Sequence, residues 1–380
     1  MKIALVTPHF PPEICGVGDH SFKLANALSS LGSEISVWTT QARPVATDYP
    51  VHQMSRPWST ASFGQVNEGL AGFKPDVVLL QYTPYLYSES GGPLTLLLPV
   101  WISWLRARLG VRVGVIAHEL HYPVNLSLAG VFRGVPQLQA FSGIALAANE
   151  VFFTYETAVR RYQKLTPWLA GSFHWLPVGA NVEPVATVPK RAEIPAGHKI
   201  LLNFGGAHPT QLLPWTFEAL EHALACPKLK GKVTLVFVGN SRAKIESELT
   251  AAGKMALKAN IRAVGRVSAT EASQWLSRSD VVLAPLMDGV CTRRGSVIAA
   301  LAHAKPVVTT TGYHTDRSLD WSKACAVVPA DHSVKFAEVV LQQLLSEKKR
   351  NALGKAGHVF YEKNLTWEII AEKLLEKLNS

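Results

Sequence analysis

The sequence predicts an α/β fold made of two doubly wound domains, and three observations support this prediction. Short apolar runs alternate with longer segments of helical period along the whole chain, and strands separated by helices pair in parallel. The 380 residues are too many for one ordinary domain, and 48% hydrophobic with 17% charged residues suffices for two cores. The alternation stops once, at a stretch with three prolines and no periodicity, and then restarts.

In the first half of the chain, the pattern predicts strands and helices in alternation. Strands are expected at residues 2–7, 34–39, 76–81, 111–117, 151–154 and 174–176, and helices at 19–31 and 94–109. The run 76–81 is almost continuously apolar, which is typical of a strand that is covered on both faces. In 19–31 apolar residues recur at helical spacing, and Gly32 follows as a stop signal.

The second half repeats this alternation. Strands are expected at 199–204, 233–238, 261–264, 281–285, 306–309 and 324–328, and helices at 215–225, 242–252, 271–277, 296–304, 335–344 and 367–378. The break between the halves reads as an interdomain linker. We therefore expect an N-terminal domain over 1–183, a linker over 184–198 and a C-terminal domain over 199–364.

The net charge of +10 comes mostly from the second half and suggests an anionic ligand there. Residues 1–180 hold 12 basic and 10 acidic side chains, whereas residues 181–380 hold 26 and 18. No basic run exceeds Lys348-Lys349-Arg350, and no nucleic-acid motif occurs. A compact polyanion such as a sugar-nucleotide diphosphate is therefore favoured over nucleic acid.

Cysteine spacing and hydropathy favour a protein of the cytoplasm. The four cysteines form no CxxC pair, so neither a zinc site nor a disulfide framework is expected. The first predicted strand runs into Pro8 and Pro11 without the apolar region of a signal peptide. The most apolar stretch, 93–105, is shorter than the roughly 20 residues that crossing a bilayer requires.

A GxG pair, Gly16-Val17-Gly18, is expected as a loop between the first strand and the first helix. Without Cβ atoms, the backbone of such a loop approaches a phosphate or a sugar closely, and the helix N-terminus offers unpaired N–H groups. The third glycine of the dinucleotide fingerprint is missing, which argues against an NAD site. A tight turn without a ligand is the alternative.

His118 directly follows the predicted strand 111–117, in the sequence AHELH. Ligands of parallel sheets bind beyond the carboxyl ends of the strands, so His118 is placed to donate a hydrogen bond to a substrate. A metal site is not favoured, because this HxxH lacks a third ligand and the helical spacing of a zinc motif. A purely structural histidine is the alternative.

The turn between the predicted strand 281–285 and the predicted helix 296–304 carries the densest set of candidate ligands. Its sequence is MDGVCTRRGS, and the candidates are Asp288, Arg293, Arg294, Gly295 and Ser296. A helix N-terminus receives diphosphate oxygens, arginine binds them through two N–H groups, and a serine there caps the helix or donates to phosphate. The alternative is a solvated arginine pair beside an ordinary cap.

Other strand ends in the second half carry weaker signals of the same kind. The residues concerned are Gly205, Gly206, Gly239, Asn240, Arg266 and Val267. Each is better explained as a turn when taken alone, although its backbone could contact a nucleotide. The sequence has neither a DxD pair nor a GxxxxGK[ST] loop, so no metal site and no phosphate loop are expected.

Four segments together resemble the retaining glycosyltransferases of GT-B fold (group 1, family 4-like), in a variant with a DGVxxRRGS turn. The segments are residues 11–28, 176–182, 265–310 and 365–378. The resemblance covers nearly the whole chain and implies two Rossmann-like domains facing a cleft. It also implies that the second domain binds the nucleotide-sugar donor, that the first binds the acceptor, and that the last helix, 365–380, packs back on the first domain. No cofactor is implied, because the nucleotide sugar is a substrate.

The resemblance assigns roles to the candidate residues. The loop Gly16–Gly18 would face the donor phosphate and sugar, His118 would position the sugar, and the turn from Arg293 to Ser296 would hold the diphosphate. In retaining members the leaving diphosphate helps to deprotonate the acceptor, so Arg293 and Arg294 would stabilise charge that grows on the phosphate. The implied activity is hexose transfer to a glycan, lipid-linked or small-molecule acceptor, as in cell-envelope glycan synthesis.

Two glutamates of the family motif are replaced in this chain. Ala299 occupies one position and Cys291 lies near the other, where Asp288 is a partial substitute. This departure supports an alternative function, a catalytically weak or inactive sugar-nucleotide-binding relative that acts as a partner subunit. A nucleotide-sugar isomerase of the same fold is a third possibility, but the paired carboxylates that it would need are not evident.

Peripheral contact with the inner face of a membrane is a further hypothesis. In the predicted helix 94–109, Trp101 and Trp104 precede Arg106 and Arg108, a pattern that suits an anionic lipid surface. A buried helix of the first domain is the favoured alternative.

Overall fold

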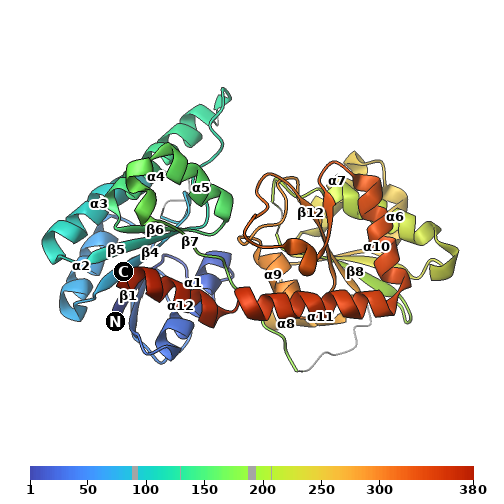
Figure 1. Ribbon diagram of the computed structural model, residues 1–380, viewed down its shortest axis with the longest axis horizontal. Helices are drawn as coiled ribbons and strands as arrows, with labels where there is room; N and C mark the ends of the chain where they lie inside the picture. Colours follow the sequence, from blue (N-terminus) through green and yellow to red (C-terminus); the bar gives the residue numbers. More distant parts are fainter. Residues whose placement is uncertain (88–92, 129, 187–193, 207) are drawn as a thin grey trace. The chain divides into compact units, whose positions relative to one another are not determined.

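The computed structural model divides the chain into two compact units, each built around a parallel sheet (Figure 1). Unit 1 comprises Met1–Val178 and Trp367–Ser380, and unit 2 comprises Gly179–Thr366. The structure describes residues 1–87, 93–128, 130–186, 194–206 and 208–380. Residues 187–193, which make up about half of the predicted linker, lie outside the described residues.

Within the described residues, unit 1 forms a seven-stranded sheet in the order β3-β2-β1-β4-β5-β6-β7, with every neighbouring pair parallel. The strands are β1 (Lys2–Val6), β2 (Glu34–Thr39), β3 (Val51–Gln53), β4 (Val77–Tyr82), β5 (Arg112–Ala117), β6 (Glu150–Phe153) and β7 (Phe173–Trp175). All of β4 is buried, as the apolar run predicted. The strand order reverses at β1, which lies between β2 and β4.

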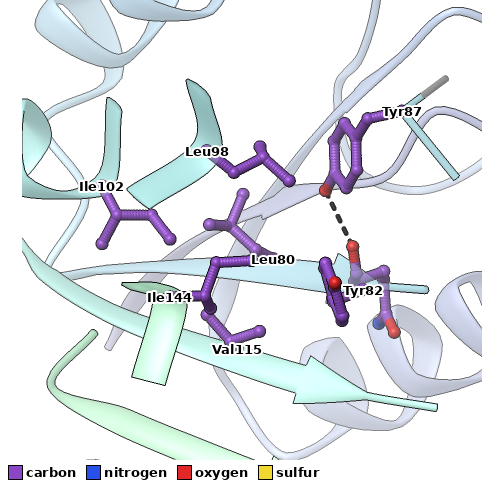
Figure 2. Close-up of a pocket in the computed structure, with 8 residues that line it drawn as sticks. Leu80, Tyr82, Tyr87, Leu98, Ile102, Val115 and Ile144 are labelled. Atoms are coloured by element: carbon purple, nitrogen blue, oxygen red, sulfur yellow. Dashed lines mark hydrogen bonds between the residues drawn. The ribbon is translucent and has the colours of Figure 1, made fainter. Parts of the chain in front are cut away.

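Helices cover both faces of this sheet. The helices and short helical turns are α1 (Gly16–Ser30), α2 (Thr60–Phe73), α3 (Pro93–Leu109), η1 (Gly130–Gly134), α4 (Val135–Ala147), α5 (Glu156–Leu165), η2 (Pro167–Ser172) and α12 (Trp367–Asn379). On one face, α1 and α12 share a core cluster with Leu5 and Leu79. On the other, Leu98 and Ile102 of α3 point toward Leu80, as Figure 2 shows.

The sequence analysis predicts none of β3, α2, α4 and α5. β3 has three residues, of which His52 and Gln53 are exposed, so no apolar alternation marks it. α2 contains three glycines, which weaken a helical signal. One of them, Gly69, is required by packing, because a Cβ there would lie 2.5 Å from Nε1 of Trp38.

The described residues of unit 2 form a six-stranded parallel sheet in the order β10-β9-β8-β11-β12-β13. The strands are β8 (Lys199–Phe204), β9 (Val233–Val238), β10 (Ile261–Gly265), β11 (Val281–Ala284), β12 (Val307–Thr311) and β13 (Ala326–Pro329). The helices and short helical turns are α6 (Leu213–Ala225), η3 (Pro227–Leu229), α7 (Arg242–Ala251), η4 (Met255–Asn260), α8 (Ala269–Arg278), α9 (Gly295–Ala302), η5 (Trp321–Lys323), α10 (Ser333–Leu345) and α11 (Glu347–Asn364).

The predicted elements of unit 2 agree closely with these bounds, and α11 is the helix that the sequence analysis omits. α11 is polar and contains Gly354 and Gly357. A Cβ on Gly354 would lie 2.2 Å from the carbonyl oxygen of Ala304, so α11 needs a glycine where it passes the end of α9. None of the helices in the described ranges combines the length and the apolar character that crossing a bilayer requires.

The core of unit 1 depends on the last helix of the chain, because α12 supplies Ile370 and Leu374 to the cluster on the α1 face. We predict that Ile370→Ala lowers the free energy of unfolding of unit 1 by about 2–5 kcal/mol, since it leaves a cavity in a packed core. Denaturant unfolding measures the change. The matched control is Glu372→Ala, an exposed position of the same helix, where a change within about 0.5 kcal/mol is expected. Equal effects of both substitutions would contradict the prediction.

Candidate functional site

Each sheet has a point where the strand order reverses, and ligands of parallel sheets bind at the carboxyl ends of the strands there. In unit 1 this switch point lies between β1 and β4, and in unit 2 between β8 and β11. The densest set of candidate residues follows β11 in unit 2, whereas Gly16, Gly18 and His118 belong to unit 1. The two sites are therefore described separately.

In unit 2 the loop after β8 faces the first turn of α9. Gly205 has φ +116°, and a Cβ there would lie 3.3 Å from Cβ of Ser296. Gly239 (φ +103°) packs against Gly205 so closely that a Cβ would lie 2.6 Å from the Gly205 carbonyl carbon. Asn240 holds the same loop by donating from Nδ2 to the Gly205 oxygen at 3.1 Å. The glycines bring the ends of β8 and β9 together beside the N-terminus of α9.

Asp288 binds both arginines of the predicted turn. Its carboxylate is fully buried and accepts a hydrogen bond from Nη2 of Arg293 at 2.9 Å. Nη2 of Arg294 also donates to both carboxylate oxygens, and to Oγ1 of Thr210 at 2.9 Å. Arg294 is itself buried and is the N-cap residue of α9. The arginines are thus an internally paired cluster and not the solvated pair that the sequence left open.

The electrostatics of this cluster keep Asp288 ionised. Burial raises the pKa of its carboxyl, but the charge of Arg294, a hydrogen bond with Thr210 and the charge of Arg293 together bring the pKa below its usual value. Two guanidinium groups and one carboxylate leave the cluster with a net positive charge. That charge lies at the N-terminal end of α9, where the helix dipole also favours an anion.

The sequence analysis does not identify two members of this cluster, His208 and Thr210. Nδ1 of His208 accepts from the backbone N–H of Thr210 at 3.2 Å, so the neutral ring carries its proton on Nε2. Burial and the neighbouring arginines lower the pKa of His208 to about 4, so the ring is neutral at pH 7. The polar sequence 208–210 (HPT), which follows Gly205 and Gly206 at the end of a predicted strand, could have marked both residues as candidates.

A second loop, which follows β12, fixes the turn after β11. Gly289 has φ +84°, and a Cβ there would lie 2.2 Å from the backbone nitrogen of Gly312. The buried carboxylate of Asp316 accepts the backbone N–H of Thr292 at 2.6 Å. The turn after β11 is therefore held by packing of Gly289 on Gly312 and by the hydrogen bond from Thr292 to Asp316. These contacts fix the position of Asp288.

The positions where the family motif has glutamates are closed to a ligand in this structure. Cys291 and Ala299 are buried, and burial raises the pKa of the Cys291 thiol to about 11. Gly206 and Arg266 are exposed and Val267 is half-buried, each beyond the end of a strand. In the described ranges no three His, Cys, Asp or Glu side chains gather to hold a metal ion.

In unit 1 the predicted loop Gly16–Gly18 is the first turn of α1, so that helix begins three residues earlier than predicted. Helical backbone forms here because Cys15 is extended and its carbonyl accepts the N–H of Asp19 at 2.8 Å. A Cβ on Gly18 would lie 3.2 Å from the backbone of His9, whereas Gly16 and Val17 are not fully buried. Burial raises the pKa of Asp19, in the same first turn, to about 6, a feature that the sequence analysis missed.

His118 lies just beyond β5, and its ring is held by two neighbours. Its Nε2 lies 2.7 Å from Oε1 of Gln81, the fully buried residue near the end of β4. The ring of His20 from α1 packs edge-on against it, with centroids 4.6 Å apart. The ring of His20 also packs edge-on against the ring of Trp367 in α12, with centroids 5.0 Å apart. Burial lowers the pKa of His118 to about 4, so His118 is neutral at pH 7.

Because Oε1 of Gln81 can only accept, Nε2 of His118 donates to it, and Nδ1 of the neutral ring is an acceptor. The sequence analysis expects His118 to donate instead. The two assignments differ in which imidazole nitrogen carries the proton. Near this strand end, the narrow space lined by Leu80, Tyr82 and Tyr87 has no room for a water molecule, so it is part of the core (Figure 2).

α3, the helix considered for membrane contact, is partly buried. Trp101 is buried and donates from Nε1 to Asn67, whereas Trp104 is exposed. Nη1 of Arg106 donates to the carbonyl oxygen of Ala147 at 2.6 Å, and Arg108 is exposed. The favoured alternative, a helix of the first domain with a buried face, agrees with this packing.

One family model matches a part of the chain that lies within unit 2. Residues 198–346 are similar to the family described as glycosyl transferases group 1. The matched range contains β8, β11, α9 and the whole Asp288 cluster. A comparison with curated protein sequences finds no match.

Solved structures share the fold of the whole chain. Sucrose-phosphate synthase from Thermosynechococcus elongatus has a TM-score of 0.74 at 17% identity, covering 99% of this chain and 98% of that chain. WaaG, a glycosyltransferase involved in lipopolysaccharide biosynthesis, has a TM-score of 0.66 at 15% identity, with 100% of both chains covered. Anabaena HepE in complex with UDP and glucose has a TM-score of 0.67 at 12% identity, covering 100% and 99%. The predicted fold class, two Rossmann-like α/β domains of GT-B type, is confirmed.

The close approach of the loops after β11 and β12 gives a prediction about stability. We expect Gly289→Ala to lower the free energy of unfolding of unit 2 by about 1–3 kcal/mol, because the side chain meets a positive φ and a backbone atom at 2.2 Å. Gly295→Ala is the control, since no heavy atom lies within 4 Å of its added Cβ. Thermal unfolding of both variants is the measurement. A melting temperature of the Gly289 variant equal to that of the control would refute the prediction.

The contact between Gln81 and His118 gives a prediction about protonation. The folded-state pKa of His118 is below the ordinary value of about 6.5, so the protein loses stability from this group as the pH falls from about 6.5 to about 4. In Gln81→Glu a carboxylate faces Nε2, and we expect it to raise the pKa of His118 by at least about one unit.

A titration of the imidazole resonances of His118 measures this shift, and the nitrogen shifts also report which ring nitrogen is protonated. Gln81→Leu is the control, because it removes the acceptor without adding charge, and its His118 should keep a low pKa. A His118 that still titrates near pH 4 in Gln81→Glu would count against the assigned contact.

Proposed function

We propose that this protein is a glycosyltransferase that moves a sugar from a nucleotide-diphosphate donor to an acceptor hydroxyl. The observation that carries the proposal is the Asp288–Arg294 cluster at the N-terminus of α9, inside the range that matches the glycosyl transferases group 1 model. It lies at the switch point of unit 2, between the ends of β8 and β11.

Three features of this site support diphosphate binding. In the first turn of α9 the N–H groups of Gly295 and Val297 are bonded to the carbonyl oxygens of Arg293 and Arg294, and the N–H of Ser296 suits a phosphate oxygen. Gly205 leaves space beside Ser296 that a side chain would fill. Nε of Arg294 is buried without a hydrogen-bond partner among the described residues, and a bound anion would satisfy it. Arg293, Gly295 and the neutral His208 extend the set of donors.

In the proposed reaction the bond between the anomeric carbon and the diphosphate oxygen breaks, and a bond to the acceptor oxygen forms. The acceptor oxygen attacks on the face that the diphosphate leaves, and its proton passes to the departing diphosphate. The sugar therefore keeps its anomeric configuration, and no protein nucleophile is needed. Arg294, already oriented by Asp288, stabilises the negative charge that grows on the leaving oxygen. We assign His118 of unit 1 to positioning the sugar, by a hydrogen bond from a sugar hydroxyl.

Structural neighbours favour a nucleotide sugar as donor. Anabaena HepE structures contain UDP, UDP with glucose, or UDP-glucose. We propose the same class of donor here, a glycan, lipid-linked or small-molecule acceptor, and a cytoplasmic site of action. Neither a cofactor nor a metal ion is part of the proposal.

A second candidate is a sugar-nucleotide-binding subunit without transferase activity. The observation in its favour is that the glutamate positions of the family motif are occupied here by buried Cys291 and Ala299, so no carboxylate at those positions contacts a donor. Release of nucleoside diphosphate separates the two candidates. Transfer with release supports the enzyme, whereas saturable binding without release supports the binding subunit.

The test combines donor binding with a variant of Arg294. In a thermal-shift panel of UDP-, GDP- and ADP-sugars, we expect at least one donor to raise the melting temperature, because a ligand of the folded state stabilises it. Arg294→Ala should lower turnover with that donor at least about tenfold, since a lost charge-assisted hydrogen bond costs about 1.5–3 kcal/mol.

Lys323→Ala is the control. It also removes one positive charge from unit 2, but from a side chain that is 76% exposed. Circular dichroism of each variant checks that unit 2 remains folded. A panel without any thermal shift, or a folded Arg294→Ala variant with the turnover of the control, would reject the proposed site.

A further inference from the structure

His20 is a buried titratable residue that the proposed reaction does not use. It lies in the second turn of α1 and is 2% exposed. Nδ1 and Nε2 of its ring are both buried, and neither has a hydrogen-bond partner among the described residues. A neutral imidazole has one donor and one acceptor nitrogen, so burying both without partners costs stability. A purely apolar ring would fill the same space without this cost, so packing alone does not explain a histidine here.

Two aromatic rings contact His20 edge-on. The ring of His118 has its centroid 4.6 Å away, with an angle of 85° between the planes. The ring of Trp367 lies at 5.0 Å and 76°. Trp367 is the first residue of α12, where the chain enters unit 1 for the second time, and α12 lies beside α1 (Figure 1). His20 therefore contacts both the last helix and the histidine that we assign to the sugar.

One hydrogen bond does not fix the ring of His118. Nε2 donates to Oε1 of Gln81 at 2.7 Å, but a ring held at one atom can still turn about that bond. The nearly perpendicular ring of His20 supplies a second contact, which blocks this turn. Together the two contacts leave one orientation, in which Nδ1 of His118 is the acceptor.

Both imidazoles are neutral at pH 7. Burial lowers the pKa of His118 to about 4. Burial, and to a smaller extent the charge that a protonated His118 would carry, keep the pKa of His20 well below its usual value. The contact between the rings is therefore an edge-to-face contact of neutral groups and involves no repulsion between charges.

We propose that His20 is a positioning residue, which holds the ring of His118 so that Nδ1 accepts a hydrogen bond from a sugar hydroxyl. The inference rests on the proposed function, in which His118 positions the sugar. His20 acts through His118 and does not itself contact the substrate. Its unpartnered nitrogens lower stability, and residues that lower stability in favour of activity are typical of active sites.

The test begins with His20→Phe, which keeps an aromatic ring and removes both nitrogens. We expect a melting temperature no lower than that of the wild type, because no unpaired nitrogen stays buried. Turnover with the donor found in the thermal-shift panel should fall about tenfold, since displacing a group that orients a substrate by about 1 Å costs up to about 100-fold.

Leu24→Val is the matched control, because Leu24 is a buried core residue one turn further along α1. It should lower the melting temperature and leave turnover unchanged. A merely structural role of His20 would make stability and turnover fall together.

A double-mutant cycle and a spectroscopic measurement test the path through His118. In a His118→Ala background, His20→Phe should lower turnover no further, because the group on which it acts is missing. The imidazole nitrogen resonances of His118 need no substrate. In the wild type they should report a single tautomer protonated on Nε2, and in His20→Phe a mixture of the two tautomers.

Two results would overturn the inference. One is a His20→Phe variant whose His118 resonances are those of the wild type. The other is a further loss of about tenfold when His20→Phe is added to His118→Ala, which would show that His20 acts by another route. Wild-type protein that turns over no donor would reject the proposed sugar transfer instead, and the resonances would still decide whether His20 orients His118.

Discussion

The buried carboxylate of Asp288 is the group on which the site in unit 2 depends. A carboxylate removed from water is tolerated only when oppositely charged groups and hydrogen-bond donors satisfy it. Arg293, Arg294 and Thr210 do so here. Arg294 also occupies the N-cap position of α9, so the ion pair lies directly before the first turn of this helix.

Pairing also changes what the arginines contribute. A guanidinium group held by a carboxylate is already oriented, so less reorganisation accompanies the arrival of an anion. The carboxylate cancels part of the positive charge, and the neutral His208 adds none. The cluster then carries one excess positive charge beside the first turn of α9. For the proposed diphosphate ligand, such a site relies on oriented groups more than on a strong field.

The fold was predictable from the sequence because buried parallel strands leave a strong signal. β8 and β9 are mostly apolar, and their predicted bounds are those of the structure. Elements whose residues are chosen for close packing leave no such signal. α2 has Gly69 against the side chain of Trp38, and α11 has Gly354 against the backbone of Ala304. Glycines at such positions weaken the helical pattern in the sequence. β3 is too short and too exposed for alternation to mark it.

The candidate site was predictable in its residues but not in its contacts. MDGVCTRRGS is conspicuous because it mixes charge with turn residues, yet the ion pairs with Asp288 depend on tertiary packing. Gln81 is the last but one residue of the apolar strand β4, and its contact with His118 spans 37 residues. Gly289 and Gly312 occupy the space that each other's side chain would need. Natural relatives that gain a side chain at either position must reroute the facing loop as well, so these two sites are expected to covary.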